Sequence, residues 1–153
     1  MPLYFAFGSN IDRAQMAQRC PGAEPVGLAT LRDHRLVFRG PSRKRGGGVL
    51  SVDPAPDEGV QGLLYEVTAS HLAALDRYEG APEWYERVTR QVHLAAGEAR
   101  DAILYRLPVH VRQMPPTQAY LAQVSAAFAA HDLDAEPLHT AAQAPSAQEP
   151  RDG

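Results

Sequence analysis

The sequence predicts an α+β fold built on a mixed or largely antiparallel β-sheet. Short runs of β-forming residues outnumber the helical segments along the chain. Most connections between these runs are too short to contain the crossover helices that parallel strands require. A sheet of this kind can close into a barrel. The length of 153 residues and the hydrophobic content of 44% fit one domain with a buried core.

The first half of the chain is predicted to be mostly strands. An apolar strand over Leu3–Phe7 stops at Gly8-Ser9-Asn10, and a short helix over Asp12–Cys20 ends at Pro21-Gly22. Further strands are expected at residues 26–32, 35–39, 49–52 and 60–67, separated by Asp33-His34, by a basic loop at 40–48 and by a turn-rich segment at 53–59.

A helix is predicted to follow from Thr68, which has the side chain of a good N-cap. Leu72 and Leu75 then lie one turn apart, and Glu79-Gly80 suits a helix end. Two more strands are expected after it, over Tyr85–Leu94 and Ala102–Leu107.

The last predicted helix opens at Pro115-Pro116, and Tyr120, Val124 and Phe128 repeat on one of its faces. From His139 to Gly153 the chain is rich in Ala, Pro, Gln, Ser and charge. We expect a disordered tail there, which leaves residues 1–138 as the folded domain.

Charge and cysteine content exclude several classes of protein. The formal net charge of −3 argues against a dedicated nucleic-acid binder. One cysteine, Cys20, excludes an intrachain disulfide and a cysteine-rich zinc site. The chain has no apolar run of membrane-spanning length and no basic leader, so we expect a cytoplasmic protein without membrane contacts. The lone lysine among many arginines, with abundant alanine, is typical of a GC-rich bacterial genome.

Two segments are candidates for chemistry. Gly8-Ser9-Asn10 lies between a strand and a helix, where free backbone N–H groups can bind an anion. Composition alone favours the alternative, a plain turn in which Asn10 or Asp12 is the N-cap of the helix. Glu79 lies at a helix C-terminus, where the helix dipole and burial would raise the pKa of its carboxyl and suit it to general base catalysis. An exposed glutamate beside a glycine cap is the alternative.

Two further segments are weaker candidates. In Trp84-Tyr85-Glu86-Arg87, aromatic rings could line a pocket while Arg87 pairs with a carboxylate, or the rings could simply pack at the start of a strand. The basic run Arg43-Lys44-Arg45 precedes Gly46–Gly48, which could hinge a lid over an anionic substrate. A solvated loop is the alternative, and the net charge disfavours RNA binding.

Four blocks, YFAFGSN, VQGLLYEV, LDRYEG with WYERV, and PPTQAYLAQV, follow one another in this order, and together they resemble the γ-glutamylcyclotransferase-like (AIG2-like) family. YFAFGSN is similar to the family's YxxYGSN block, and VQGLLYEV to its V-x-G-x-L-Y-x-V strand. LDRYEG with WYERV is similar to its LDxxEG…YxR block, and PPTQAYLAQV to the start of its helix with Pro-x-x-Tyr-Leu. The resemblance extends from about Leu3 to about Leu133.

This resemblance implies a small mixed β-barrel flanked by helices. It implies an enzyme that converts a γ-glutamyl amino acid, peptide or amine into 5-oxoproline and a free amine. The α-amine of the glutamyl group attacks its own γ-carbonyl, so no cofactor, metal or covalent intermediate is needed. We expect a small-molecule partner only, and a monomer or homodimer.

The resemblance also implies roles for individual residues. Glu79 matches the family's catalytic glutamate, and Phe7, Gly8, Ser9 and Asn10 match its substrate-holding loop. The residues that match other positions near the pocket are Tyr85, Arg87 and Tyr120. Phe7 departs from the family's tyrosine and removes one possible hydrogen bond. A non-catalytic domain that binds a small ligand in the same pocket is the rival hypothesis.

Overall fold

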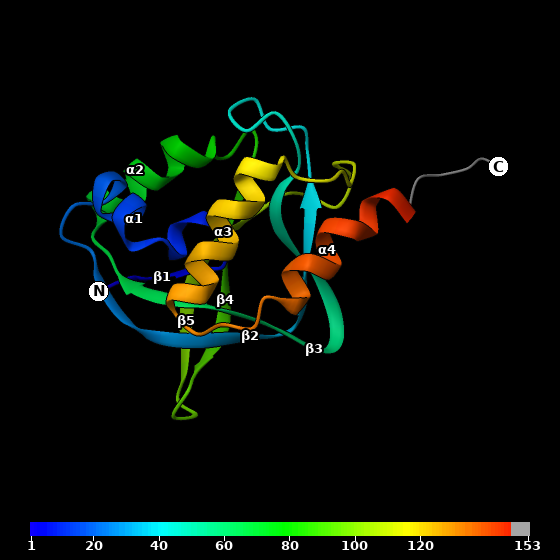
Figure 1. Ribbon diagram of the computed structural model, residues 1–153. Helices are drawn as coiled ribbons and strands as arrows, with labels where there is room; N and C mark the ends of the chain where they lie inside the picture. The colour runs from blue at the N-terminus through cyan, green and yellow to red at the C-terminus, as the bar shows by residue number, and fades with distance from the viewer. Residues whose placement is uncertain (148–153) are drawn as a thin grey trace.

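Five strands form a closed barrel in a computed structural model that describes residues 1–147 (Figure 1). The order around the barrel is β1-β3-β2-β4-β5. β1 pairs in parallel with β5 through Tyr4 and Ile103, and the other pairings are antiparallel. This confirms the α+β class and the mixed barrel. The strands are β1 Leu3–Ala6, β2 Glu24–Arg39, β3 Val49–Glu66, β4 Glu86–Leu94 and β5 Ala99–Arg106.

Helices cover one side and one end of the barrel. In Figure 1, α3 lies across the barrel, α4 lies beside it, and α1 and α2 lie together at one end. β1 leads directly into η1 and α1, and α1 packs against α2. The turn after β1 therefore lies near the C-terminal end of α2, and both line the same pocket. The helices are η1 Ser9–Ile11, α1 Arg13–Arg19, α2 Ala69–Glu79, α3 Gln118–Ala130 and α4 Glu136–Ala147.

β2 and β3 form one long hairpin, where the sequence predicts four short strands. Pairing runs from Arg39 opposite Val49 to Glu24 opposite Glu66. The register shifts near Asp33, which has a φ of 61° and accepts a hydrogen bond from the Asp57 backbone N–H at 2.9 Å. The turn-forming residues therefore form a bulge inside continuous strands, because the pairing on either side outweighs the local turn signals.

The core that the barrel shares with its covering helices is apolar and closely packed. Among its fully buried side chains are Phe5, Leu64, Tyr65, Leu104 and Phe128. Gly62 on β3 faces β1 so closely that a Cβ would collide with the Ala6 carbonyl oxygen. A glycine is therefore required where the first strand joins the barrel.

The end of the chain corrects one prediction. The sequence predicts disorder from His139, but α4 continues to Ala147 and packs against β2. Leu138 is fully buried and Ala141 is 6% exposed, so residues three apart give this alanine-rich segment an apolar face. Residues 148–153 of the predicted tail lie outside the described residues. Within residues 1–147, no helix is both long and apolar enough to cross a bilayer.

Candidate active site

Helix α2 ends with Glu79 at the wall of a cavity. The helix starts at Thr68, whose side chain accepts a hydrogen bond from the His71 backbone N–H while the His71 ring accepts one from Thr68, both at 3.1 Å. It stops at Gly80, which has a φ of 67°. Only glycine adopts this left-handed conformation without strain, so the Glu79-Gly80 pair fixes the end of the helix.

An inner pocket of about 40 Å³ lies between Glu79 and the turn after β1. Its wall comes from β1 and the following turn, the start of β3, the end of α2, the start of β4, β5 and α3. The lining residues are Tyr4, Phe7, Gly8, Ser9, Asn10, Leu50, Glu79, Tyr85, Tyr105 and Tyr120. The closed barrel thus brings together predicted site residues that are more than 100 positions apart in the sequence.

The Glu79 carboxyl group has no hydrogen-bond or ion-pair partner within residues 1–147. Burial raises its pKa above the ordinary value, and the positive charges of Arg19, Lys44 and Arg45 oppose that rise. A carboxyl group with a raised pKa and no internal partner can exchange a proton with a bound molecule.

The turn Gly8-Ser9-Asn10 presents unpaired backbone donors. The backbone N–H groups of these three residues have no acceptor in the described part of the chain. Asp12, and not Asn10, caps α1, because its Oδ1 accepts from the backbone N–H groups of Ala14 and Gln15 at 3.0 and 3.3 Å. The turn is therefore free of the capping role that its sequence also allows.

Side-chain contacts hold this turn in place. Gln15 Nε2 donates to Ser9 Oγ at 2.7 Å and to Asn10 Oδ1 at 2.8 Å. Asn10 Nδ2 donates to the Tyr4 hydroxyl at 2.9 Å, and the Tyr65 hydroxyl donates to the Asn10 carbonyl at 3.0 Å. The turn is anchored on both sides, which fixes the direction of its N–H groups.

Two tyrosines are fixed by the same backbone residue. The Tyr85 hydroxyl donates to the Leu50 carbonyl at 2.9 Å, and the Tyr120 hydroxyl accepts from the Leu50 N–H at 3.2 Å. Burial raises the pKa of Tyr120 to about 12 and that of Tyr85 well above its ordinary value. Both phenols are neutral near pH 7, so they can donate hydrogen bonds but cannot act as bases.

An outer cleft of about 590 Å³ opens beyond Glu79. Ser9, Glu79, Tyr85 and Tyr120 line both this cleft and the inner pocket. The remaining lining residues come from α1, the loop between β2 and β3, and the segment after α2: Arg19, Pro41, Ser42, Arg43, Lys44, Arg45, Val49, Arg77, Tyr78, Gly80, Glu83 and Trp84.

The basic loop of this cleft is packed against residues 114–117 rather than hinged. The backbone N–H of Gly48 donates to the Pro115 carbonyl at 2.9 Å, and that of Ser42 to the Gly47 carbonyl at 2.9 Å. A Cβ at Gly48 would collide with the Met114 carbonyl oxygen. The glycines permit close backbone packing, which does not support the hinge that the sequence suggests.

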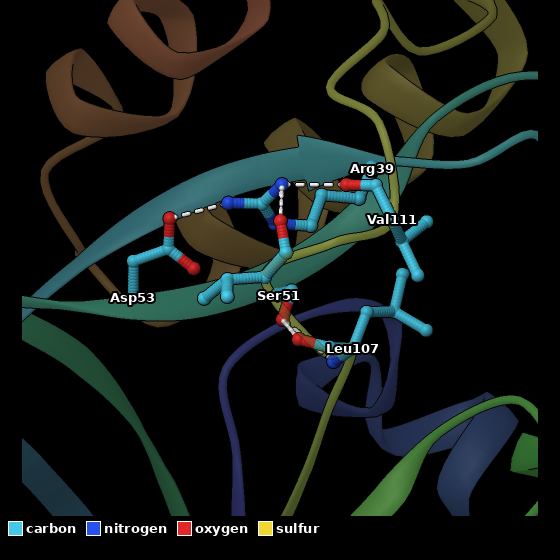
Figure 2. A network of polar contacts seen from close by, with 6 residues as sticks. Arg39, Ser51, Asp53, Leu107 and Val111 are labelled. Carbon is cyan, nitrogen blue, oxygen red and sulfur yellow. Dashed lines mark hydrogen bonds and ion pairs between the residues drawn. The ribbon is translucent and has the colours of Figure 1, made fainter.

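A buried ion pair holds the base of the same loop, as Figure 2 shows. Arg39, the last residue of β2, contacts Asp53 on β3 at 2.6 Å, and their side chains are 6% and 11% exposed. The Arg39 guanidinium also donates to the Val109 carbonyl at 3.0 Å and the Val111 carbonyl at 2.6 Å. It thereby joins the hairpin to the segment after β5.

Comparison with known proteins identifies the family. The family model "Gamma-glutamyl cyclotransferase, AIG2-like" matches residues 4–122. The chain belongs to this family.

Relatives and solved structures agree with this assignment. The chain is 28% identical over 123 residues to a γ-glutamylcyclotransferase from Bos taurus and 33% identical to one from Mus musculus. Each alignment covers 77% of this chain but 65% of the relative, so the chain spans less than two thirds of their length. A solved structure named γ-glutamyl cyclotransferase superposes with a TM-score of 0.81 at 25% identity, covering 99% of this chain and 90% of that one. A crystal structure of a protein from Homo sapiens superposes with a TM-score of 0.79 at 26% identity, covering 99% of this chain and 89% of that one.

Most residues expected from the resemblance to the cyclotransferase family line the inner pocket. Phe7, Gly8, Ser9, Asn10, Glu79, Tyr85 and Tyr120 all do so. Phe7 is 6% exposed, and the centres of the Phe7 and Phe5 rings are 6.3 Å apart. The Phe7 ring therefore packs into the core, and Phe7 also borders the pocket.

Arg87 is the exception among these residues. It lines neither cavity, and its guanidinium bonds Asp76 at 3.0 and 3.1 Å on the outer surface. Asp76 also accepts from the Tyr105 hydroxyl at 2.6 Å, and the Tyr105 ring borders the pocket. Tyr85 precedes β4, and within that strand Glu86, Val88, Arg90 and Val92 are more buried than the alternate residues, so Arg87 lies on the outer face. Its contact with the site is therefore indirect.

Sequence reasoning missed several residues of the site. Gln15 and Arg19 are four apart on α1, and both contact Asn10. Gln123 on α3 joins Gln15 to Arg45, with distances of 2.7 and 2.9 Å. The spacing of four between Gln15 and Arg19 indicates that both lie on one face of α1. No signal in the sequence shows that this face contacts the turn after β1 or helix α3. Within residues 1–147, no cluster of three or more His, Cys, Asp or Glu side chains could hold a metal ion.

Proposed function

We propose that the chain releases 5-oxoproline from a γ-glutamyl compound, with Glu79 as the general acid and base. One observation carries the proposal: the unpartnered Glu79 carboxyl group borders a pocket that is also lined by Gly8, Ser9 and Asn10, whose backbone N–H groups have no acceptor within residues 1–147. Family membership supports the same reaction. The rival hypothesis, a ligand-binding domain without activity, predicts a carboxylate that points into solvent, and the burial of Glu79 disfavours it.

The reaction moves two protons from the α-nitrogen to the leaving nitrogen and needs no other reagent. The α-ammonium of the glutamyl group gives one proton to Glu79, and the resulting amine attacks the γ-carbonyl carbon, which forms the ring C–N bond. Glu79 gives that proton to the original amide nitrogen, and the bond from the γ-carbon to this nitrogen breaks. The ring nitrogen loses its second proton and the released amine gains one to become an ammonium, so the atoms and charges balance.

The environment of Glu79 suits this role. The carboxyl group of a free glutamate has a pKa of about 4.3, and an α-amine has a pKa of about 8. A large difference between the pKa values of donor and acceptor slows proton transfer. Burial raises the pKa of Glu79 and narrows the gap. The nearby cations oppose the rise and favour the carboxylate form, which is the form that accepts the proton.

The turn and the tyrosines provide the substrate's anchors. The N–H groups of Gly8, Ser9 and Asn10 suit the α-carboxylate of the glutamyl group or the oxyanion that forms at its γ-carbon. The phenols of Tyr85 and Tyr120 are fixed by Leu50 and so offer rigid walls. Both reacting groups belong to one substrate, and rigid anchors favour catalysis by bending the glutamyl chain into a shape ready for attack.

Glu79→Gln tests the proposal. We would measure 5-oxoproline release from γ-glutamyl amino acids, dipeptides and amines, with Glu58→Gln as the control because Glu58 is exposed and lines neither cavity. We expect the Glu79 variant to lose at least 100-fold in kcat, the lower range for general acid–base catalysis, and the control to match the parent. Substrate binding without turnover by the parent would favour the non-catalytic alternative, and full activity of Glu79→Gln would exclude Glu79 from the role.

A further inference from the structure

The outer cleft has more positive charge than the proposed reaction requires for its effect on the pKa of Glu79. Cationic side chains reach it from α1, from the loop between β2 and β3, and from the last turn of α2. None of them forms an ion pair with a carboxylate of residues 1–147. The cleft's cations are Arg19, Arg43, Lys44, Arg45 and Arg77, and its carboxyl groups are Glu79 and the exposed Glu83.

Neutral groups hold Lys44 in position. Its ammonium donates to the Tyr78 carbonyl at 3.1 Å and lies 5.2 Å from the centre of the Tyr78 ring. Arg19 lies over the same ring at 4.7 Å. Two cations that contact one aromatic ring are oriented but not neutralised, so their charge remains available to a ligand.

Arg45 is held in a similar way by a ring and an amide of other residues. Its guanidinium lies 4.9 Å from the centre of the Tyr120 ring and donates to Gln123 Oε1 at 2.9 Å. Arg43 and Arg77 are exposed, and their side chains have no hydrogen-bond, ion-pair or ring partner within the described chain. The cleft therefore has three cations held by neutral partners and two without a partner.

The position of the cleft relates these charges to the substrate. Glu79, Tyr85 and Tyr120 line both cavities, so a γ-carbon held beside Glu79 lies at their junction. If the glutamyl group occupies the inner pocket, the group on the far side of the amide bond extends into the outer cleft. At about 590 Å³ this cleft is much larger than a small alkylamine needs.

We infer that the outer cleft binds the leaving amine and selects one with at least two negative charges, such as an acidic amino acid or a short acidic peptide. The inference rests on the proposed function and specifies its substrate class. The five cations exceed the two carboxyl groups of the cleft by three, so a single carboxylate on the ligand would leave two positive charges without a counter-charge. Lys44 and Arg43 are the specificity-determining residues, because both lie on the loop and both can reach the ligand without breaking an internal ion pair.

A different role for the same cations makes a different prediction. Arg19, Lys44 and Arg45 also oppose the rise in the pKa of Glu79, so they could act only by adjusting this carboxyl group. In that case, removing one of them would change kcat by the same factor for every substrate and would shift the pH profile. Recognition of the leaving amine instead changes KM and depends on the substrate's charge.

The test compares three substrates by their rate of 5-oxoproline release. γ-Glutamyl-glutamate has two carboxylates on the leaving amine, γ-glutamyl-glutamine has nearly the same shape with one, and γ-glutamyl-propylamine has none. We expect kcat/KM to fall in that order, by about two- to fivefold for each charge removed, the range for partly exposed ion pairs. Higher ionic strength should reduce the difference.

Arg43→Gln and Lys44→Gln identify the residues responsible. Each should lower the ratio of kcat/KM for γ-glutamyl-glutamate to that for γ-glutamyl-propylamine by about two- to fivefold, through KM. The control Arg35→Gln removes an exposed charge of β2 that lines neither cavity, and should keep the parent ratio. A parent that prefers γ-glutamyl-propylamine, or variants that lower kcat equally for all three substrates, would overturn the inference but leave the cyclotransferase proposal intact. No turnover of any substrate would overturn both.

Discussion

Replacing Arg39 with methionine should strongly destabilise the protein. The Asp53 carboxylate would remain buried, with its side chain 11% exposed, but without the guanidinium at 2.6 Å. Breaking a buried ion pair by removing one partner costs about 3–5 kcal/mol, because the remaining charge is left without compensation. For a domain of this size, that loss lowers Tm by about 6–20 °C.

The double variant Arg39→Met/Asp53→Leu separates charge burial from packing. It removes both charges, and Figure 2 shows that the pair lies between the hairpin and the segment containing Val111. Arg39 Nε and Asp53 Oδ1 have no hydrogen-bond partner, so the pair does not satisfy all of its buried polar atoms. We therefore expect the double variant to recover most of the lost stability.

Thermal and urea unfolding of the parent, the single variant and the double variant would measure these effects. Arg35→Met serves as the control, because Arg35 is exposed on the same strand and its replacement should change stability by less than about 0.5 kcal/mol. A loss below about 1 kcal/mol for Arg39→Met, or a double variant less stable than the single one, would refute this reasoning.

Two more predictions concern the site. Burial raises the pKa of Glu79 above its value in the unfolded chain, so ionisation of Glu79 reduces stability as the pH rises through the raised pKa. The Tm of Glu79→Gln should therefore equal that of the parent near about pH 4 and exceed it at neutral pH. A difference in Tm between the two proteins that shrinks as the pH rises would contradict this. Arg87→Ala should retain most of the parent's turnover and lose less than about 1 kcal/mol of stability, because its pair with Asp76 is 42% and 35% exposed. A large rise in KM for this variant would show that Arg87 contacts substrate.

Local signals in the sequence were sufficient for much of the fold. The helix end at Glu79-Gly80 was predictable because a glycine cap depends on one residue's φ angle. The hairpin of β2 and β3 was not, since Asp33 and the segment at 53–59 are turn-forming by composition. β2 and β3 continue through these turn-forming residues because the two strands pair with each other. That pairing joins two separate segments, so neither segment's composition predicts it.

The candidate site shows the same division. Gly8-Ser9-Asn10 and Glu79 stand out in the sequence because a glycine turn after a strand and a carboxylate at a helix end are local features. The sequence does not reveal Gln15, Gln123 or the contacts of Leu50 with Tyr85 and Tyr120, because those interactions join α1, α3, β3 and β4.

The sequence by itself determined the fold class, the family blocks and the identity of the candidate base. The tertiary structure alone decided that Arg87 faces Asp76 and that α4 packs against β2. It also decided that the basic loop borders the cleft beside Glu79. The physical reason is that a side chain's chemistry and its local backbone preference are encoded at one position. Which face it presents, and which charge it meets, depends on how distant segments pack when the barrel closes.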